Sequence, residues 1–217
     1  MKHEVHAIVF DLDGLMLNTE DIFDLAGNEL MRRRGKVMTE ECHHQMLGRR
    51  PNEAFEIMKR LMDVNDPIAD LQNETREIFE SLIDEHLGTM HGLYELLDLI
   101  EGAVLPKAVA TSSPREYMTD LMTRFELMHR FPVSLAAEDV TAGKPEPEIY
   151  LKAAALLAIE PANMVVLEDS EAGTRAAAAA GAIAISVPNR HTKVQDFSMA
   201  TRVVDSLVDE RLLELIR

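Results

Sequence analysis

The chain is short of cysteine and of positive charge, and it has no long hydrophobic run. Cys42 is the one cysteine among 217 residues, so an intrachain disulfide is impossible and a disulfide-stapled secreted fold is excluded. Lys and Arg number 22 against 38 Asp and Glu, which gives a net charge of −16. Such an excess repels phosphodiester backbones and anionic lipid, so we expect no nucleic acid and no membrane partner. The longest apolar stretch, 176–187, is far shorter than the roughly 20 residues that span a membrane.

What remains is the composition of a soluble globular protein. Hydrophobic residues make up 47% of the chain, which is enough to bury a real core. The length fits one domain, or one domain plus a small insertion. The first residues lead straight into a short apolar run and do not resemble a signal peptide. We therefore expect a cytoplasmic protein, present as a monomer or a weak dimer.

Strand-like and helix-like segments alternate along most of the chain, with one all-helical interruption. Short apolar runs typical of buried strands occur at residues 5–10, 108–110, 133–136, 164–167, 182–187 and 202–204. Between about 18 and 86 only helical patterns occur. This order predicts an α/β fold: a doubly wound, Rossmann-like parallel sheet over 1–14 and 91–217, with an all-helical cap inserted at 15–90.

Two of the predicted helices have recognisable starts. In the segment Ser113-Pro114-Arg115-Glu116, Ser113 is expected to cap a helix, with Pro114 at the first helical position and Glu116 completing a capping box. Ser170 is expected to cap a second helix, which ends at Gly181.

Polar side chains suited to chemistry follow three of the predicted strands. They are Asp11 and Asp13 after the first strand, Thr111 and Ser112 after the second, and Glu168 and Asp169 after a later one. Ligands of doubly wound sheets bind at the carboxyl ends of the strands, so these groups converge if the strands are neighbours. Clustered carboxylates need a hard cation, and Mg²⁺ prefers such oxygen ligands.

Each motif alone also has an ordinary structural interpretation. An Asp-x-Asp-Gly segment after a strand is usually a turn, and a Glu-Asp-Ser segment before a helix is usually an N-terminal cap. Lys144, in Gly143-Lys144-Pro145, could be a solvated loop lysine. The order of the motifs along the chain makes the combination far more specific than any one of them.

Taken in order, Asp11-Leu12-Asp13-Gly14, Thr111-Ser112, Lys144-Pro145 and Glu168-Asp169 resemble the four motifs of the haloacid dehalogenase-like hydrolase superfamily. The segments 11–20 and 143–181 closely resemble the branch that holds small-molecule phosphatases and β-phosphoglucomutases. The resemblance covers essentially the whole chain, and it is strong in the core and weak in the helical insertion. Asn18 is a departure, because the branch often has Asp there.

The resemblance implies a role for each motif. Asp11 would be the nucleophile that forms an aspartyl-phosphate, and Asp13 would be the general acid and then the general base. Lys144 and Thr111 would stabilise the transferring phosphoryl group, with backbone amides near Ser112. Mg²⁺ would be held by carboxylates of the motifs and by one backbone carbonyl. These metal ligands would be Asp11, the carbonyl of Asp13, Asp169 and, directly or through water, Glu168.

The helical insertion resembles the cap that selects substrates in this superfamily. Arg49, in Gly48-Arg49-Arg50, is the candidate for binding a second anionic group of the substrate, besides the phosphate at the core motifs. Two solvated arginines at the start of a helix are an equal alternative interpretation.

The function these motifs imply is a Mg²⁺-dependent phosphatase acting on a small phosphorylated metabolite, such as a sugar or nucleoside monophosphate. A β-phosphoglucomutase-like isomerase is the alternative, since it would share every core residue. A catalytically inactive metabolite-binding protein is a third, and the intact set of Asp11, Asp13, Lys144 and Asp169 argues against it. A dehalogenase is disfavoured because Asp13 suits an oxygen leaving group that needs a proton.

Overall fold

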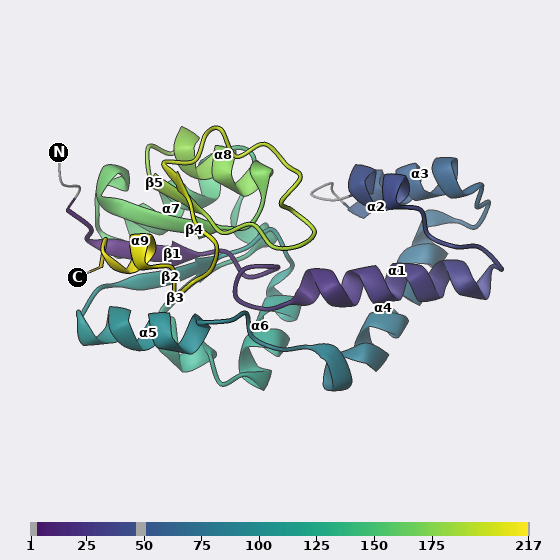
Figure 1. The fold of residues 1–217 in the computed structure, drawn as a ribbon, viewed down its shortest axis with the longest axis horizontal. Coiled ribbons are helices and arrows are strands. Elements are labelled where there is room, and N and C mark those ends of the chain that lie inside the picture. The colour runs from purple at the N-terminus through teal and green to yellow at the C-terminus, as the bar shows by residue number, and fades with distance from the viewer. Residues whose placement is uncertain (1–3, 47–50, 217) are drawn as a thin grey trace. The chain divides into compact units, whose positions relative to one another are not determined.

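The fold was analysed in a computed structural model that describes residues 4–46 and 51–216. The chain divides into two compact units, which are described separately below. The core unit comprises residues 1–17 and 89–217, and the helical unit comprises residues 18–88. Figure 1 shows both, with most helices and strands labelled.

The core unit is built on a parallel sheet that has six strands in the described residues, in the order β3-β2-β1-β4-β5-β6. The strands are β1 (Ala7–Phe10), β2 (Lys107–Ala110), β3 (Val133–Leu135), β4 (Met164–Glu168), β5 (Ile183–Ser186) and β6 (Arg202–Val203). The first strand of the chain lies in the middle, between β2 and β4. Every adjacent pair is parallel, so all the carboxyl ends lie on one edge.

Helices lie on both faces of this sheet, with α7 and α8 on one side and α5 and α6 on the other (Figure 1). These helices are α5 (Leu93–Gly102), α6 (Arg115–Arg124), α7 (Glu148–Leu157) and α8 (Glu171–Ala179). Shorter helical turns complete the unit: η1 (Met128–Arg130), η2 (Ala137–Asp139), η3 (Pro161–Asn163) and α9 (Glu210–Leu213). Such double coverage explains why the central strands are continuous apolar runs, buried along their whole length.

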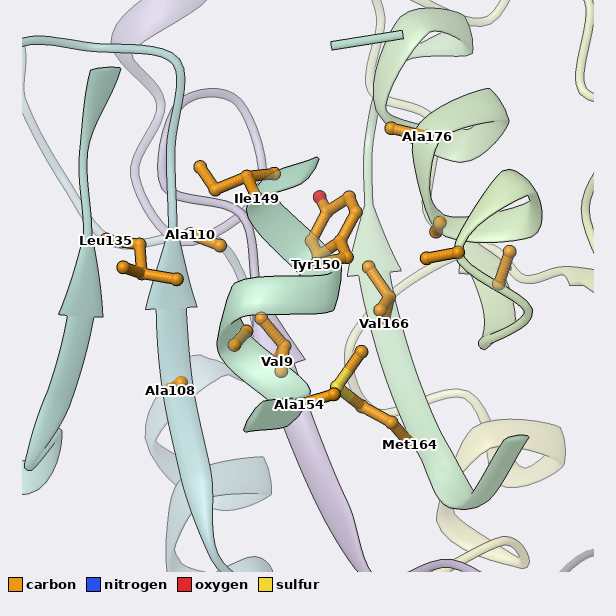
Figure 2. Packing of buried hydrophobic residues seen from close by; sticks show 14 residues of the cluster. Val9, Ala108, Ala110, Leu135, Ile149, Tyr150, Ala154, Met164, Val166 and Ala176 are labelled. Atoms are coloured by element: carbon orange, nitrogen blue, oxygen red, sulfur yellow. The ribbon is translucent and has the colours of Figure 1, made fainter. Parts of the chain in front are cut away.

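A hydrophobic core lies between the sheet and helices α7 and α8 (Figure 2). Alternate strand residues such as Val9 and Val166 face it, because side chains along a strand point to opposite faces in turn. From α8 the alanines Ala176 and Ala177 pack against the sheet, and their small size lets the helix approach closely. Tyr150 of α7 is fully buried here, beside Val166 in Figure 2. Its hydroxyl needs a polar partner, and that partner belongs to the site described below.

The helical unit contains α1 (Thr19–Arg33), α2 (Glu40–Met46), α3 (Pro51–Met62) and α4 (Ile68–His86). In α1 the buried residues Ile22, Ala26 and Leu30 recur every fourth position, which gives the helix one apolar face. Helices α1 and α4 pack together, with the rings of Phe23 and Phe79 4.5 Å apart.

The two segments that join the units pair with each other. Leu17 and Thr89 form an antiparallel bridge, and the Met90 amide donates to the Met16 carbonyl at 2.8 Å. At the next position Asn18 Oδ1 accepts from the Gly88 amide at 2.7 Å. The helical unit of residues 18–88 thus lies within the 15–90 expected for the inserted cap.

The predicted fold class, a doubly wound parallel sheet with an inserted all-helical segment, is confirmed. Ser170 is the N-cap of α8 as predicted, since its hydroxyl accepts from the Gly173 amide. In the described part of the chain, no helix combines the length and the apolar character needed to cross a bilayer.

Candidate active site

The sheet order brings the three polar strand ends side by side. Asp11 directly follows central β1, Thr111 follows β2 on one flank, and Glu168 ends β4 on the other. All three side chains are almost completely buried, with 6%, 1% and 1% of each residue exposed, respectively. The parallel register of β1 with β2 and β4 therefore brings Asp11 beside Thr111 and Glu168, which lie 100 or more positions further along the chain.

Lys144 joins two of these strand ends. Its ammonium donates to Asp11 Oδ1 and to Glu168 Oε1, each at 2.5 Å, and to the Ala110 carbonyl at 3.0 Å. Burial by itself lowers the pKa of Lys144, but the carboxylates of Asp11 and Glu168 outweigh it and hold the pKa well above its usual value. Lys144 is therefore a permanent positive charge beside Asp11, and it is not a solvated loop lysine.

The Glu168 carboxylate is held on both oxygens. Oε1 accepts from Lys144 and from the Tyr150 hydroxyl, at 2.5 Å each. Oε2 accepts from the Ser170 hydroxyl at 3.0 Å and from the Ser170 amide at 3.3 Å. The role of Tyr150 in the site was not predicted from the sequence. A tyrosine on the apolar face of a helix was the signal, because a buried hydroxyl requires a partner.

Asp13 accepts hydrogen bonds from three hydroxyl groups. Thr111 and Ser113 donate to Oδ2, at 3.1 and 2.6 Å, and Tyr117 donates to Oδ1 at 3.1 Å. The expectation that Ser113 caps a helix is wrong, because α6 begins at Arg115 without a side-chain cap and the Ser113 hydroxyl goes to Asp13 instead. Nor does Pro114 occupy the first helical position. The ionised carboxylate is a charged acceptor, which makes the hydrogen bond from the Ser113 hydroxyl a strong one.

Asp169 is held from the other side by Asn189. Asn189 Nδ2 donates to Asp169 Oδ2 at 2.7 Å and to the Gly14 carbonyl at 3.1 Å. Asn189 lies just past β5, so it is one more polar residue beyond the carboxyl end of a strand, and that placement could have identified it.

The two predicted substrate-binding residues are Ser112 and Arg49. Ser112 follows Thr111 and is exposed. Arg49 lies outside the described residues.

The buried acidic groups fit a hard divalent cation. Asp11, Glu168 and Asp169 each bring a carboxylate oxygen within 4.8 Å of the others. Burial raises the pKa of Asp11 well above its usual value, and Glu168 and Asp13 raise it further against the opposing effect of Lys144. A further positive charge would therefore stabilise the ionised site, and carboxylate oxygens are the ligands that hard cations take.

The fold and the site together define a class of protein. The chain belongs to the haloacid dehalogenase-like hydrolases, and it matches that family over residues 8–187. This confirms the superfamily that the four motifs resembled.

Individual relatives place it within that family. The chain is 30% identical over 177 residues to the phosphorylated carbohydrates phosphatase of Thermotoga maritima, an alignment that covers 82% of each chain. Among solved structures it is similar to CbbY from Rhodobacter sphaeroides in complex with phosphate, with a TM-score of 0.79 and 30% identity over 94% of this chain and 95% of that one. It is also similar to a Thermotoga maritima protein provisionally called a β-phosphoglucomutase, with a TM-score of 0.80 and 27% identity over 98% of each chain.

Proposed function

We propose that this phosphoric monoester hydrolase is a Mg²⁺-dependent phosphatase that cleaves a small phosphorylated metabolite, a sugar or nucleoside monophosphate, through an aspartyl-phosphate on Asp11. The observation that carries the proposal is the buried contact between Asp11 and Lys144, with Glu168 and Asp169 beside it. A carboxylate with a fixed cation against one oxygen is arranged to attack a phosphoryl group with the other. The phosphatase relative from Thermotoga maritima supports the same enzyme class.

In the first step Asp11 Oδ2 attacks phosphorus, because Oδ1 is bonded to Lys144. The bond between phosphorus and the ester oxygen breaks, and Asp13 gives a proton to that oxygen so that the alcohol departs neutral. To do so Asp13 first takes up a proton from solvent and turns from its hydroxyl partners toward the substrate. Thr111, released from Asp13, then donates to a phosphoryl oxygen, as do backbone amides near Ser112.

In the second step a water molecule attacks phosphorus and Asp13 takes its proton. The bond between phosphorus and Asp11 breaks, inorganic phosphate leaves, and the Asp11 carboxylate is restored. Lys144 stays charged throughout and neutralises part of the charge on the transferring group.

Asp11, the Asp13 carbonyl, Asp169 and Glu168 are the residues that would hold Mg²⁺. When bound, the ion neutralises charge on the phosphoryl oxygens and keeps Asp11 ionised. Since Glu168 already accepts four hydrogen bonds, we assign it to the ion through water. A protein of net charge −16 repels an anionic substrate, and the positive charges of Lys144 and the cation would offset that repulsion at the site.

The proposal is tested by a panel of phosphorylated metabolites incubated with Mg²⁺, with both free phosphate and isomerised product followed. Release of phosphate from sugar or nucleoside monophosphates in parent protein, and its loss in Asp11→Asn, is the expected result. Asp11→Asn keeps the shape of the side chain but removes the nucleophile. Turnover in Asp11→Asn within tenfold of the parent would remove Asp11 from that role.

A β-phosphoglucomutase-like isomerase is the second candidate, and the similarity to the Thermotoga maritima protein of that provisional name favours it. A mutase must hold a bisphosphate, and the core residues account for one phosphate only. We assign the second anion site to the helical segment, with Arg49 as its candidate group. Isomerised product without stoichiometric release of phosphate, together with a loss in Arg49→Ala confined to substrates with two anionic groups, would favour the mutase.

A further inference from the structure

Asn189 connects the loop after β5 to the acidic cluster. Its amide nitrogen donates to Asp169 Oδ2 at 2.7 Å and to the Gly14 carbonyl at 3.1 Å. Both acceptors belong to the segments that carry the acidic motifs, and Asn189 comes from neither. No role for this residue follows from the phosphoryl-transfer steps described above.

The orientation of the Asn189 amide is fixed by its partners. Oδ1 accepts from the backbone amides of His191 at 2.8 Å and Thr192 at 3.1 Å, so Nδ2 must face Asp169. The Asn189 backbone amide in turn donates to the Thr192 hydroxyl at 3.0 Å, and Thr192 is only 2% exposed. Loop 189–192 therefore presents a preformed donor to the Asp169 carboxylate.

The contact between Asn189 and Asp169 lies close to the Gly14 backbone. A Cβ atom on Gly14, whose φ is +74°, would lie 2.4 Å from Asp169 Oδ2 and 2.7 Å from Asn189 Nδ2. The glycine thus allows both side chains to approach its backbone. The Gly14 backbone therefore lies directly against the contact between Asn189 and Asp169 Oδ2.

This contact bears on which cation the cluster accepts. A hydrogen-bond donor on Oδ2 competes with a cation for that oxygen, so Asp169 is held to binding an ion through one oxygen. Mg²⁺ takes about six ligands in a strict octahedron and suits single carboxylate oxygens. Ca²⁺ takes about six to eight ligands in flexible geometry and readily accepts both oxygens of one carboxylate.

We propose that Asn189 makes the metal site selective for Mg²⁺ over Ca²⁺, by keeping Asp169 Oδ2 engaged and the carboxylate in a one-oxygen binding mode. Asn189 is a positioning residue, since it acts through Asp169. The inference rests on the proposed metal-dependent function, and it adds the residue that sets which ion binds.

The test is calorimetric titration of the whole protein with MgCl₂ and with CaCl₂, read as the ratio of the two dissociation constants. In Asn189→Ala we expect the preference for Mg²⁺ over Ca²⁺ to fall about tenfold, within the range by which partners of metal ligands change affinity. Asn189→Leu is the second variant, because it keeps the size of the side chain but has no group that can donate to Asp169, and a melting temperature close to that of the parent guards against misfolding. Its preference should shift toward Ca²⁺ as well.

Asn163→Ala is the matched control. Asn163 lies in η3, at the amino end of β4 and therefore at the opposite edge of the sheet, and its side chain contacts His6. The ion preference should be unchanged in this variant. If the two Asn189 variants bound Mg²⁺ and Ca²⁺ equally more weakly than the parent, or if neither dissociation constant changed, the proposal would be overturned. A parent protein that binds neither ion would instead refute the proposed metal site, and with it any selectivity.

Discussion

Gly173→Ala probes how closely the Glu168 carboxylate is held. Gly173 lies in the first turn of α8, and a Cβ atom at that position would come within 1.8 Å of Glu168 Oε1 and 2.2 Å of Oε2. Atoms cannot approach so closely, so the carboxylate must move in this variant. Its displacement breaks the 2.5 Å bonds that Oε1 accepts from Lys144 and Tyr150.

The expected loss of stability is the difference of two terms. Breaking a buried ion pair costs about 3–5 kcal/mol, and the side chains of Lys144 and Glu168 are only 6% and 1% exposed. Alanine favours a helix over glycine by about 1 kcal/mol, which offsets part of that cost. The free energy of unfolding should therefore fall by about 2–4 kcal/mol. In a chain of 217 residues this lowers Tm by roughly 4–16 °C.

The assay is urea unfolding followed by circular dichroism, with Gly102→Ala as the matched control. Gly102 is the last residue of α5, and a Cβ atom there meets nothing within 4 Å, so the control should lose no stability. If Gly173→Ala were as stable as the parent, Glu168 could not be held between Lys144 and Tyr150 as described.

Three further predictions concern Tyr150, Glu101 and the metal requirement. Tyr150→Phe should lower the free energy of unfolding by about 1–3 kcal/mol in urea, since it removes only the hydroxyl that donates to Glu168; an unchanged midpoint would mean that this bond contributes nothing. Hydrogen bonds from Arg130 and Lys107 lower the pKa of Glu101 from 4.5 to about 2, so its contribution to stability is present above pH 4.5 and lost as the pH falls toward 2. Glu101→Gln should therefore lose less unfolding free energy than the parent as the pH falls through that window. The difference should be modest because the Glu101 side chain is 41% exposed. Identical dependence of the unfolding free energy on pH in the two proteins would contradict this. EDTA should abolish turnover, Mg²⁺ should restore it and Ca²⁺ should inhibit, whereas full activity in chelator would refute the metal requirement.

The fold was readable from the sequence because its signals are local. Each strand is a short apolar run with a polar end, and a parallel sheet places all such ends on one edge. Once β1 lies between β2 and β4, Asp11, Thr111 and Glu168 must meet, whatever the intervening chain does.

The hydrogen-bond partners of these residues could not be predicted from the sequence, because their contacts depend on tertiary packing rather than on local sequence pattern. Tyr150 lies on an apolar helix face, and only the close approach of α7 to the sheet shows that its hydroxyl reaches Glu168. Ser113 has the sequence context of a helix cap, but α6 starts at Arg115, and the Ser113 hydroxyl donates to Asp13, which lies 100 positions earlier in the chain. Asn189 sits in an irregular loop whose course no periodicity describes.

Chemical trapping at Asp11 tests the central claim most directly. Parent protein turning over its best substrate with Mg²⁺ is quenched and treated with borohydride, which reduces an aspartyl-phosphate to homoserine, and the peptides are then sequenced by mass spectrometry. If Asp11 is the nucleophile, homoserine should appear at position 11 only when substrate is present. Turnover with no homoserine at that position, or with phosphate attached to another residue, would contradict it.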